Sequence, residues 1–174
     1  MKNILVPIDF SEHSNYAVEV AVDLAKKNGA TILLLHCVEL PRRFVTESTS
    51  ALPEELFFMR EAGLNVKKLS EELKSKGVAV KTVVETTALT YAVKHLLEDE
   101  SVDFIVMGST GATGSKELFL GSNAEKIVRT SSVPVLVIKD KTDISKVKKL
   151  TFACDFSQKY IDAFQKAVAF ANVI

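Results

Sequence analysis

Several features are scarce in this sequence, and each scarcity excludes a class of protein. Only two of the 174 residues are cysteines, Cys37 and Cys154, and neither belongs to a Cys-x-x-Cys pair. A disulfide framework or a zinc site is therefore not expected, and both side chains are predicted to be buried thiols. Lysine plus arginine equal aspartate plus glutamate at 22 each, so no excess of positive charge predicts binding to nucleic acid.

Long apolar runs are also missing. The longest have the length of a strand, well short of the roughly 20 residues that cross a membrane. The opening residues, Met-Lys-Asn-Ile-Leu-Val-Pro-Ile-Asp, lack the apolar core and the cleavage site of a signal peptide. We therefore expect a cytoplasmic protein that does not contact a membrane.

What the sequence does contain is an alternation of strand and helix patterns. Nearly continuous apolar runs, typical of strands buried on both faces, occur at residues 3–9, 31–38, 78–85, 103–108 and 133–139. Segments with apolar residues at three- and four-residue spacing, typical of helices, separate these runs. Such alternation requires a parallel sheet with helices on both faces. The sequence therefore predicts a doubly wound α/β domain.

Local signals predict several helix ends. Ser11 or Ser14 is expected to cap the start of the first helix, and Gly29 stands where a left-handed closing residue belongs. A long helix is predicted from about residue 54 to residue 76, and Thr87 is expected to cap the helix after the third strand.

The end of the chain repeats its beginning. Residues 2–25 and 148–171 align without a gap at a constant offset of 146, and the tripeptide Asp-Phe-Ser recurs at 9–11 and 155–157. Four alanine and valine positions of the following helix match as well. Chance similarity between two amphipathic helices is the alternative to a true repeat.

The repeat predicts the domain organisation. We expect one domain at residues 1–140, a charged linker at 141–149, and the first strand and helix of a truncated second copy at 150–174. Because that copy would lack the rest of its sheet, we expect the tail to pack against a neighbouring chain, giving a dimer, or against its own first domain.

One stretch concentrates glycine. Residues 107–123, between the fourth strand and the next helix, hold four of the seven glycines. In an open α/β sheet such a turn borders the ligand crevice at the carboxyl ends of the strands. Glycine brings backbone N–H groups close to an anion where a Cβ would intrude. Ser122 stands near the start of the following helix, which favours negative charge. The stretch predicts a phosphate cradle, with a merely mobile loop as the alternative.

The spacing of these glycines resembles that of one family. The common nucleotide fingerprints GxxxxGK[ST] and GxGxxG are both absent. Instead, Gly108-x2-Gly111-x9-Gly121-Ser122 resembles the G-x2-G-x9-G-[ST] pattern of ATP-binding universal stress proteins. The resemblance covers residues 2–139 and includes the strand ends Val-Pro-Ile-Asp-Phe-Ser and Asp-Phe-Ile-Val-Met-Gly-Ser-Thr-Gly.

The resemblance implies a fold and a ligand site. The fold would be a five-stranded parallel sheet of order 3-2-1-4-5, like that of adenine nucleotide alpha hydrolases, with strands one and four adjacent. Asp9 would bind the ribose hydroxyls, and the backbone at Pro7 and Cys37 would meet the adenine. The phosphates, bridged by Mg²⁺ or Mn²⁺, would be held by Gly108, Gly111, Gly121, Ser122 and the backbone of Asn123.

The resemblance also implies a function. We expect an ATP-binding regulatory protein of the stress response, paired through its fifth strand as a dimer or a tandem pseudo-dimer. The alternatives are an interaction module of the same fold that holds no nucleotide, and a slow ATP-hydrolysing or adenylyl-transferring enzyme. No group that would activate water is evident, so any hydrolysis is expected to be slow.

Simpler roles stay open for some of these residues. Asp9 and Ser122 could each cap the helix that follows. His13 stands near Ser11 and Asp9, but no nucleophile elbow frames Ser11. Nucleophilic catalysis is therefore not expected.

Overall fold

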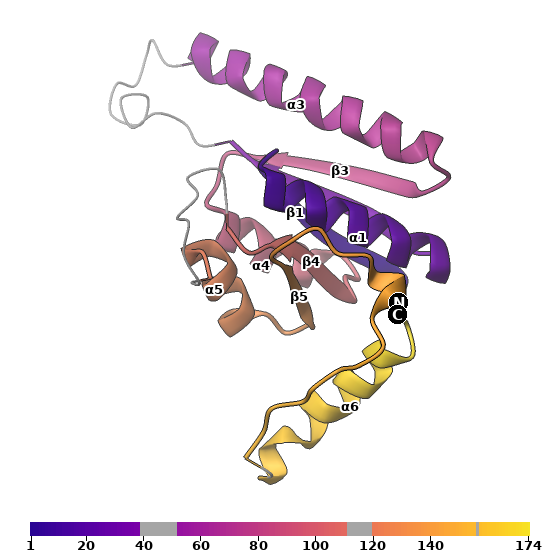
Figure 1. The fold of residues 1–174 in the computed structure, drawn as a ribbon. Helices are drawn as coiled ribbons and strands as arrows, with labels where there is room; N and C mark the ends of the chain where they lie inside the picture. Colours follow the sequence, from indigo (N-terminus) through magenta and orange to yellow (C-terminus); the bar gives the residue numbers. More distant parts are fainter. Residues whose placement is uncertain (39–51, 111–119, 156) are drawn as a thin grey trace.

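Five parallel strands form one sheet with helices on both faces in a computed structural model of the chain (Figure 1). The structure describes residues 1–38, 52–110, 120–155 and 157–174. The strand order is β3-β2-β1-β4-β5, as the family resemblance implied. All five predicted strands are confirmed, namely β1 (Asn3–Ile8), β2 (Thr31–Cys37), β3 (Ala79–Glu85), β4 (Phe104–Gly108) and β5 (Val135–Ile138).

The helices divide between the two faces because residues alternate along each buried strand. Ile4 and Val6 of β1 point to the face that α1 (Glu12–Asn28) and α3 (Leu52–Ser75) cover. Leu5 points to the opposite face, which α4 (Leu89–Asp99) and α5 (Ser122–Thr130) cover.

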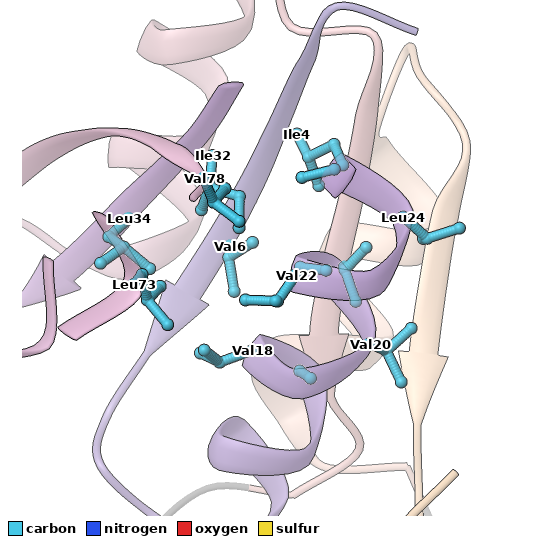
Figure 2. Packing of buried hydrophobic residues seen from close by; sticks show 14 of the residues in the cluster. Ile4, Val6, Val18, Val20, Val22, Leu24, Ile32, Leu34, Leu73 and Val78 are labelled. Carbon is cyan, nitrogen blue, oxygen red and sulfur yellow. The ribbon is translucent and has the colours of Figure 1, made fainter. Parts of the chain in front are cut away.

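Apolar burial between α1 and the sheet stabilises the central strands. Val18 and Val22 of α1 face the side chains of β1 and β2, and Leu73 of α3 completes this layer (Figure 2). Each fully buried aliphatic side chain of this kind contributes roughly 1.5–3 kcal/mol relative to an exposed one. This burial therefore stabilises the packing of α1 and α3 against β1 and β2.

The predicted caps of α1 are confirmed, and that of α4 is not. Ser11 caps α1, because its hydroxyl oxygen accepts from the backbone N–H of Ser14 at 3.2 Å. Gly29 closes the helix in the left-handed conformation, with φ at 64°. The prediction for Thr87 was wrong: Ala88 occupies the capping position of α4 and makes no side-chain hydrogen bond there. The turn runs one residue longer than the sequence pattern suggested.

The tail after β5 begins by packing against the first domain. Ile144, in a short 3₁₀ turn at Ile144–Lys146, is buried in the same apolar cluster as α1. At the end of the chain the Phe170 ring stacks on Phe104 with ring centroids 5.0 Å apart, and Asn28 donates to the carbonyl of Val173 at 3.4 Å. Of the two packing alternatives, the structure shows the contact with the first domain.

The middle of the tail lacks the strand that the repeat suggested. Residues 151–155 form no regular structure. The expected helix is present as α6 (Ile161–Ala171), whose beginning stands away from the sheet in Figure 1. An isolated strand would have no backbone hydrogen-bond partners along its edges, which is a physical reason for an irregular conformation here.

One hydrogen bond is common to the two Asp-Phe-Ser tripeptides. Asp9 Oδ1 accepts from the backbone N–H of Ser11 at 3.0 Å, and Asp155 Oδ1 accepts from that of Ser157 at 2.9 Å. Burial differs, however. Val18 of α1 is 5% exposed, whereas Phe164, at the matching position of α6, is 52% exposed.

Across the described ranges, none of the helices combines the length and the apolar character that crossing a bilayer would require.

Candidate functional site

A cavity of about 400 Å³ opens at the carboxyl ends of the strands. The parallel register brings these ends to one edge, because Ile8 pairs with His36 of β2 and Leu5 pairs with Ile105 of β4. Seven of the eight residues predicted from the sequence line this cavity: Pro7, Asp9, Cys37, Gly108, Gly121, Ser122 and Asn123. The eighth, Gly111, lies outside the described residues.

Asp9 is oriented by the turn between β1 and α1. Its carboxylate accepts from the backbone N–H of Ser11, while Ser11 itself caps the helix. The capping role considered for Asp9 thus belongs to Ser11. Phe10, between the two, adopts a left-handed backbone with φ at 61°, a strained conformation for a bulky residue. The Phe10 ring lies 5.1 Å from that of His36, whose Nδ1 donates to the Ile8 carbonyl at 2.8 Å.

Cys37 forms part of the wall at the end of β2. It is a free, partly buried thiol, as is Cys154, rather than fully buried as the sequence suggested. Burial, and secondarily the nearby carboxylate of Glu85, raises the pKa of the Cys37 thiol to about 11. The side chain is therefore protonated near neutral pH and acts here as a small apolar surface.

The opposite wall is formed by the turn after β4 and the start of α5. The backbone N–H of Ser109 donates to the Ile138 carbonyl at 2.8 Å, and that of Gly121 donates to the Ser109 carbonyl at 2.7 Å. These bonds fix the two ends of the glycine-rich stretch against each other. Gly121 is the capping residue of α5 and provides no side-chain cap, so Ser122 begins the helix instead of capping it.

The two described glycines of this wall are needed by the protein's own packing. A Cβ on Gly108 would lie 2.8 Å from the carbonyl carbon of His13, and one on Gly121 would lie 3.0 Å from the Ser109 carbonyl oxygen. Neither has a positive φ. Glycine at these two positions therefore has two possible explanations: room for an anion, as the sequence suggested, and the close packing of the protein's own backbone.

Some residues at the site were missed by the sequence argument. Thr87, Ala88 and Leu89 line the cavity at the start of α4, where no side chain caps the helix. Ser109 and Thr110 line it beside Gly108. Their position directly after strands three and four was a signal that could have identified them, because such turns meet at this edge.

Among the described residues, His13 and Ser11 each have a hydrogen-bond partner near the site. The His13 Nδ1 lies 3.1 Å from the Thr110 hydroxyl, and the Ser11 hydroxyl oxygen accepts from Ser14. Within the described part of the chain, no three His, Cys, Asp or Glu side chains gather in a way that could hold a metal ion.

Comparison with known proteins gives a consistent result. Residues 1–139 match the sequence profile of the universal stress protein family. Universal stress protein MJ0577 of Methanocaldococcus jannaschii is 31% identical over 155 residues, which cover 80% of this chain and 96% of that protein. The solved structure of MJ0577 superposes with a TM-score of 0.73, covering 82% of this chain and 98% of that one.

Two further solved structures share the fold at lower identity. A universal stress protein from Archaeoglobus fulgidus in complex with dAMP is 15% identical, with a TM-score of 0.53 over 80% of this chain and 98% of that one. A universal stress protein in complex with cAMP is 20% identical, with a TM-score of 0.54 over 79% of this chain and 96% of that one.

Proposed function

Because this chain belongs to the universal stress protein family, we propose that it binds an adenine nucleotide, ATP foremost, and acts as a nucleotide-dependent regulator of the stress response. One observation carries the proposal: seven residues chosen from the sequence for nucleotide contacts line one cavity. Two relatives of the same fold bind dAMP and cAMP, which supports an adenine ligand.

The order of the strands suggests how the nucleotide would lie. Cys37 ends β2, Asp9 follows β1, and Gly108 ends β4, so these three residues follow one another across the sheet edge. Neighbouring strands are about 4.8 Å apart. The adenine would lie near Pro7 and Cys37, the ribose hydroxyls at the Asp9 carboxylate, and the phosphates beyond Gly108.

The start of α5 is suited to the phosphates. Its first backbone N–H groups donate to no capping side chain, because glycine at position 121 has none, and the helix dipole favours an anion there. Gly121, Ser122 and Asn123 would donate to phosphate oxygens, with Gly111 contributing from outside the described residues. Mg²⁺ or Mn²⁺ would bridge those oxygens and neutralise their charge.

Isothermal titration calorimetry with ATP, ADP and AMP in the presence of Mg²⁺ tests the proposal. We expect saturable heat for ATP. Absence of heat with all three nucleotides would remove the proposal.

A matched pair of aspartate variants sharpens this test. Asp9→Asn keeps an oxygen that can accept from Ser11 but loses the negative charge that favours a ribose diol. ATP affinity should fall roughly tenfold, the value of one charge-assisted hydrogen bond. Asp23→Asn, on the exposed side of α1, should leave it unchanged.

A variant at α5 separates the regulator from an interaction module that uses no nucleotide. Ser122→Asp places a negative charge where the helix tolerates it but where phosphates would be repelled. Gly121→Val is less informative, since its side chain would push against Ser109. If cells carrying Ser122→Asp kept the protein's full stress function, the interaction module would be favoured. Rapid metal-dependent ATP turnover would instead favour an enzyme.

We also propose that residues 150–174 begin a second copy of the domain. The repeated aspartate-to-serine turn and the matching positions of α1 and α6 support this organisation. In a tandem protein or a dimer, pairing through β5 would cover the outer edge of that strand.

A further inference from the structure

His13 has no role in the nucleotide contacts described above, yet it joins two parts of the site. It lies in the first turn of α1, and its Nδ1 is 3.1 Å from the hydroxyl of Thr110, in the turn after β4. Its backbone also packs directly against Gly108, closely enough that a Cβ there would collide. A side-chain contact and a backbone contact thus tie the same residue to the end of β4.

The first turn of α1, which carries the His13 imidazole, is stabilised by several contacts. Ser11 caps the helix start, and the buried Ser14 hydroxyl donates to the Ser11 carbonyl at 3.0 Å. The ring of Tyr16 meets the imidazole edge-on at 6.3 Å, and the Tyr16 hydroxyl donates to Glu12. The first turn of α1 can therefore hold a neighbouring loop in place.

Thr110 connects the first turn of α1 to the cavity. It lines the cavity, whereas His13 does not. Thr110 also borders the start of α5, because a Cβ on Gly121 would lie 3.3 Å from the Thr110 Cα. The turn of Ser109 and Thr110 is thus enclosed between the first turn of α1 and the N-terminal end of α5.

We propose that His13 is a positioning residue for the phosphate side of the site. Its hydrogen bond to Thr110 fixes the turn after β4, and with it the placing of the backbone that faces the phosphates. The inference rests on the proposed nucleotide binding. His13 itself makes no contact with the ligand in this arrangement, so the effect of replacing it on affinity should depend on whether the ligand carries phosphates.

The test compares the affinities of ATP and adenosine in the full chain, measured by calorimetry and by competition. His13→Ala should weaken ATP binding about fivefold to tenfold, the worth of one hydrogen bond, and leave adenosine binding unchanged. Thr110→Val should do the same. The double variant should be no weaker than either single one, because both remove the same bond. His13→Asn, whose amide offers a donor and an acceptor, should recover part of the affinity.

His95→Ala is the matched control. His95 lies on the exposed side of α4, where its ring contacts Tyr91 at 4.5 Å and does not line the cavity. This variant should bind ATP as the unmodified chain does.

Several results would overturn the inference. Equal losses for ATP and adenosine would indicate general damage, and additive losses in the double variant would show that the two residues do not act together. Unchanged ATP binding in His13→Ala would refute the positioning role of His13 and leave the proposed nucleotide binding standing. An unmodified chain that binds no ATP would refute the proposed function as well. Should His13→Ala unfold in a thermal melt, Thr110→Val and His13→Asn decide the question.

Discussion

Gly108 shows how a single missing Cβ sets the geometry of the site. Gly108→Ala would force a methyl group into the backbone of His13, and we expect a loss of about 1–3 kcal/mol in the free energy of unfolding. A Cβ on Gly63, inside α3, would instead meet no atom within 4 Å. Gly63→Ala should therefore stabilise the protein by roughly 0.5–1 kcal/mol through helix propensity. Urea titration of both variants measures the contrast, and equal effects would contradict it.

Cys37 yields a second prediction at the scale of the residue. Because burial and Glu85 raise the pKa of its thiol to about 11, the reactive thiolate is scarce at pH 8. In a Cys154→Ser background, the rate of alkylation by iodoacetamide should rise about tenfold per pH unit from pH 8 to pH 10. Glu85→Gln should move this profile to lower pH. A plateau below pH 9 would be inconsistent with the buried environment.

Among the elements, the starts of β1 and β4 are joined by one carboxylate. Asp103 accepts from the backbone N–H of Lys2 at 2.5 Å and of Asn3 at 3.0 Å. The bond from Lys2 is the main cause of the lowered pKa of Asp103, and the bond from Asn3 adds to it. Since that pKa is lower in the folded chain, the stabilisation is complete above the pKa of an unfolded aspartate, about 3.9. It is lost as the pH falls through the folded pKa.

Asp103→Ala should accordingly destabilise the protein at neutral pH and not in acid. The expected cost is about 1 kcal/mol at pH 7, kept small by solvent screening. The difference from the unmodified chain should shrink toward zero below about pH 4. Asp140→Ala, an exposed loop position, serves as the control. Chemical denaturation across this pH range measures both, and a difference that persisted in acid would argue against the carboxylate.

The elements themselves could largely be predicted from the sequence, because their signals are local. Continuous apolar runs identified the strands, and Ser11 and Gly29 marked the ends of α1. The sequence failed where distant contacts decide. Thr87 could not be excluded as a cap from composition alone, and the reason for glycine at position 108 lies in α1, far away in the chain.

The candidate site, too, could be predicted only where the sequence carries a local or family signal. Gly121 was found because a family spacing marks it, and Asp9 because the end of the first strand resembles that family; their common cavity follows from the strand order. Thr110 carries no such mark, and its link to His13 exists only after folding. Sequence reasoning thus identified several of the residues at the sheet edge, but not the contacts that hold them in place.

At the scale of the whole molecule, α6 leaves an apolar surface uncovered. Ile161, Phe164 and Val168 are 42%, 52% and 45% exposed, on the same helix. If a second chain covers this surface, independently of any pairing through β5, Phe164→Glu should convert the resulting dimer to a monomer. Gln165→Glu, at an exposed neighbouring position, should not.

Light scattering after size-exclusion chromatography, at micromolar concentration, measures this change in mass. A monomeric unmodified chain, or a dimer that survives Phe164→Glu, would contradict association through α6.

The hydrogen bond from the Ser11 amide to the Asp9 carboxylate has a counterpart between Ser157 and Asp155, where the described residues 151–155 form no strand. The hydrogen bond from an aspartate to the amide two positions later therefore occurs both beside a strand and without one. We therefore expect that the Asp-Phe-Ser stretch, placed between a strand and a helix of an unrelated protein, would form the same hydrogen bond and present its carboxylate in the same way.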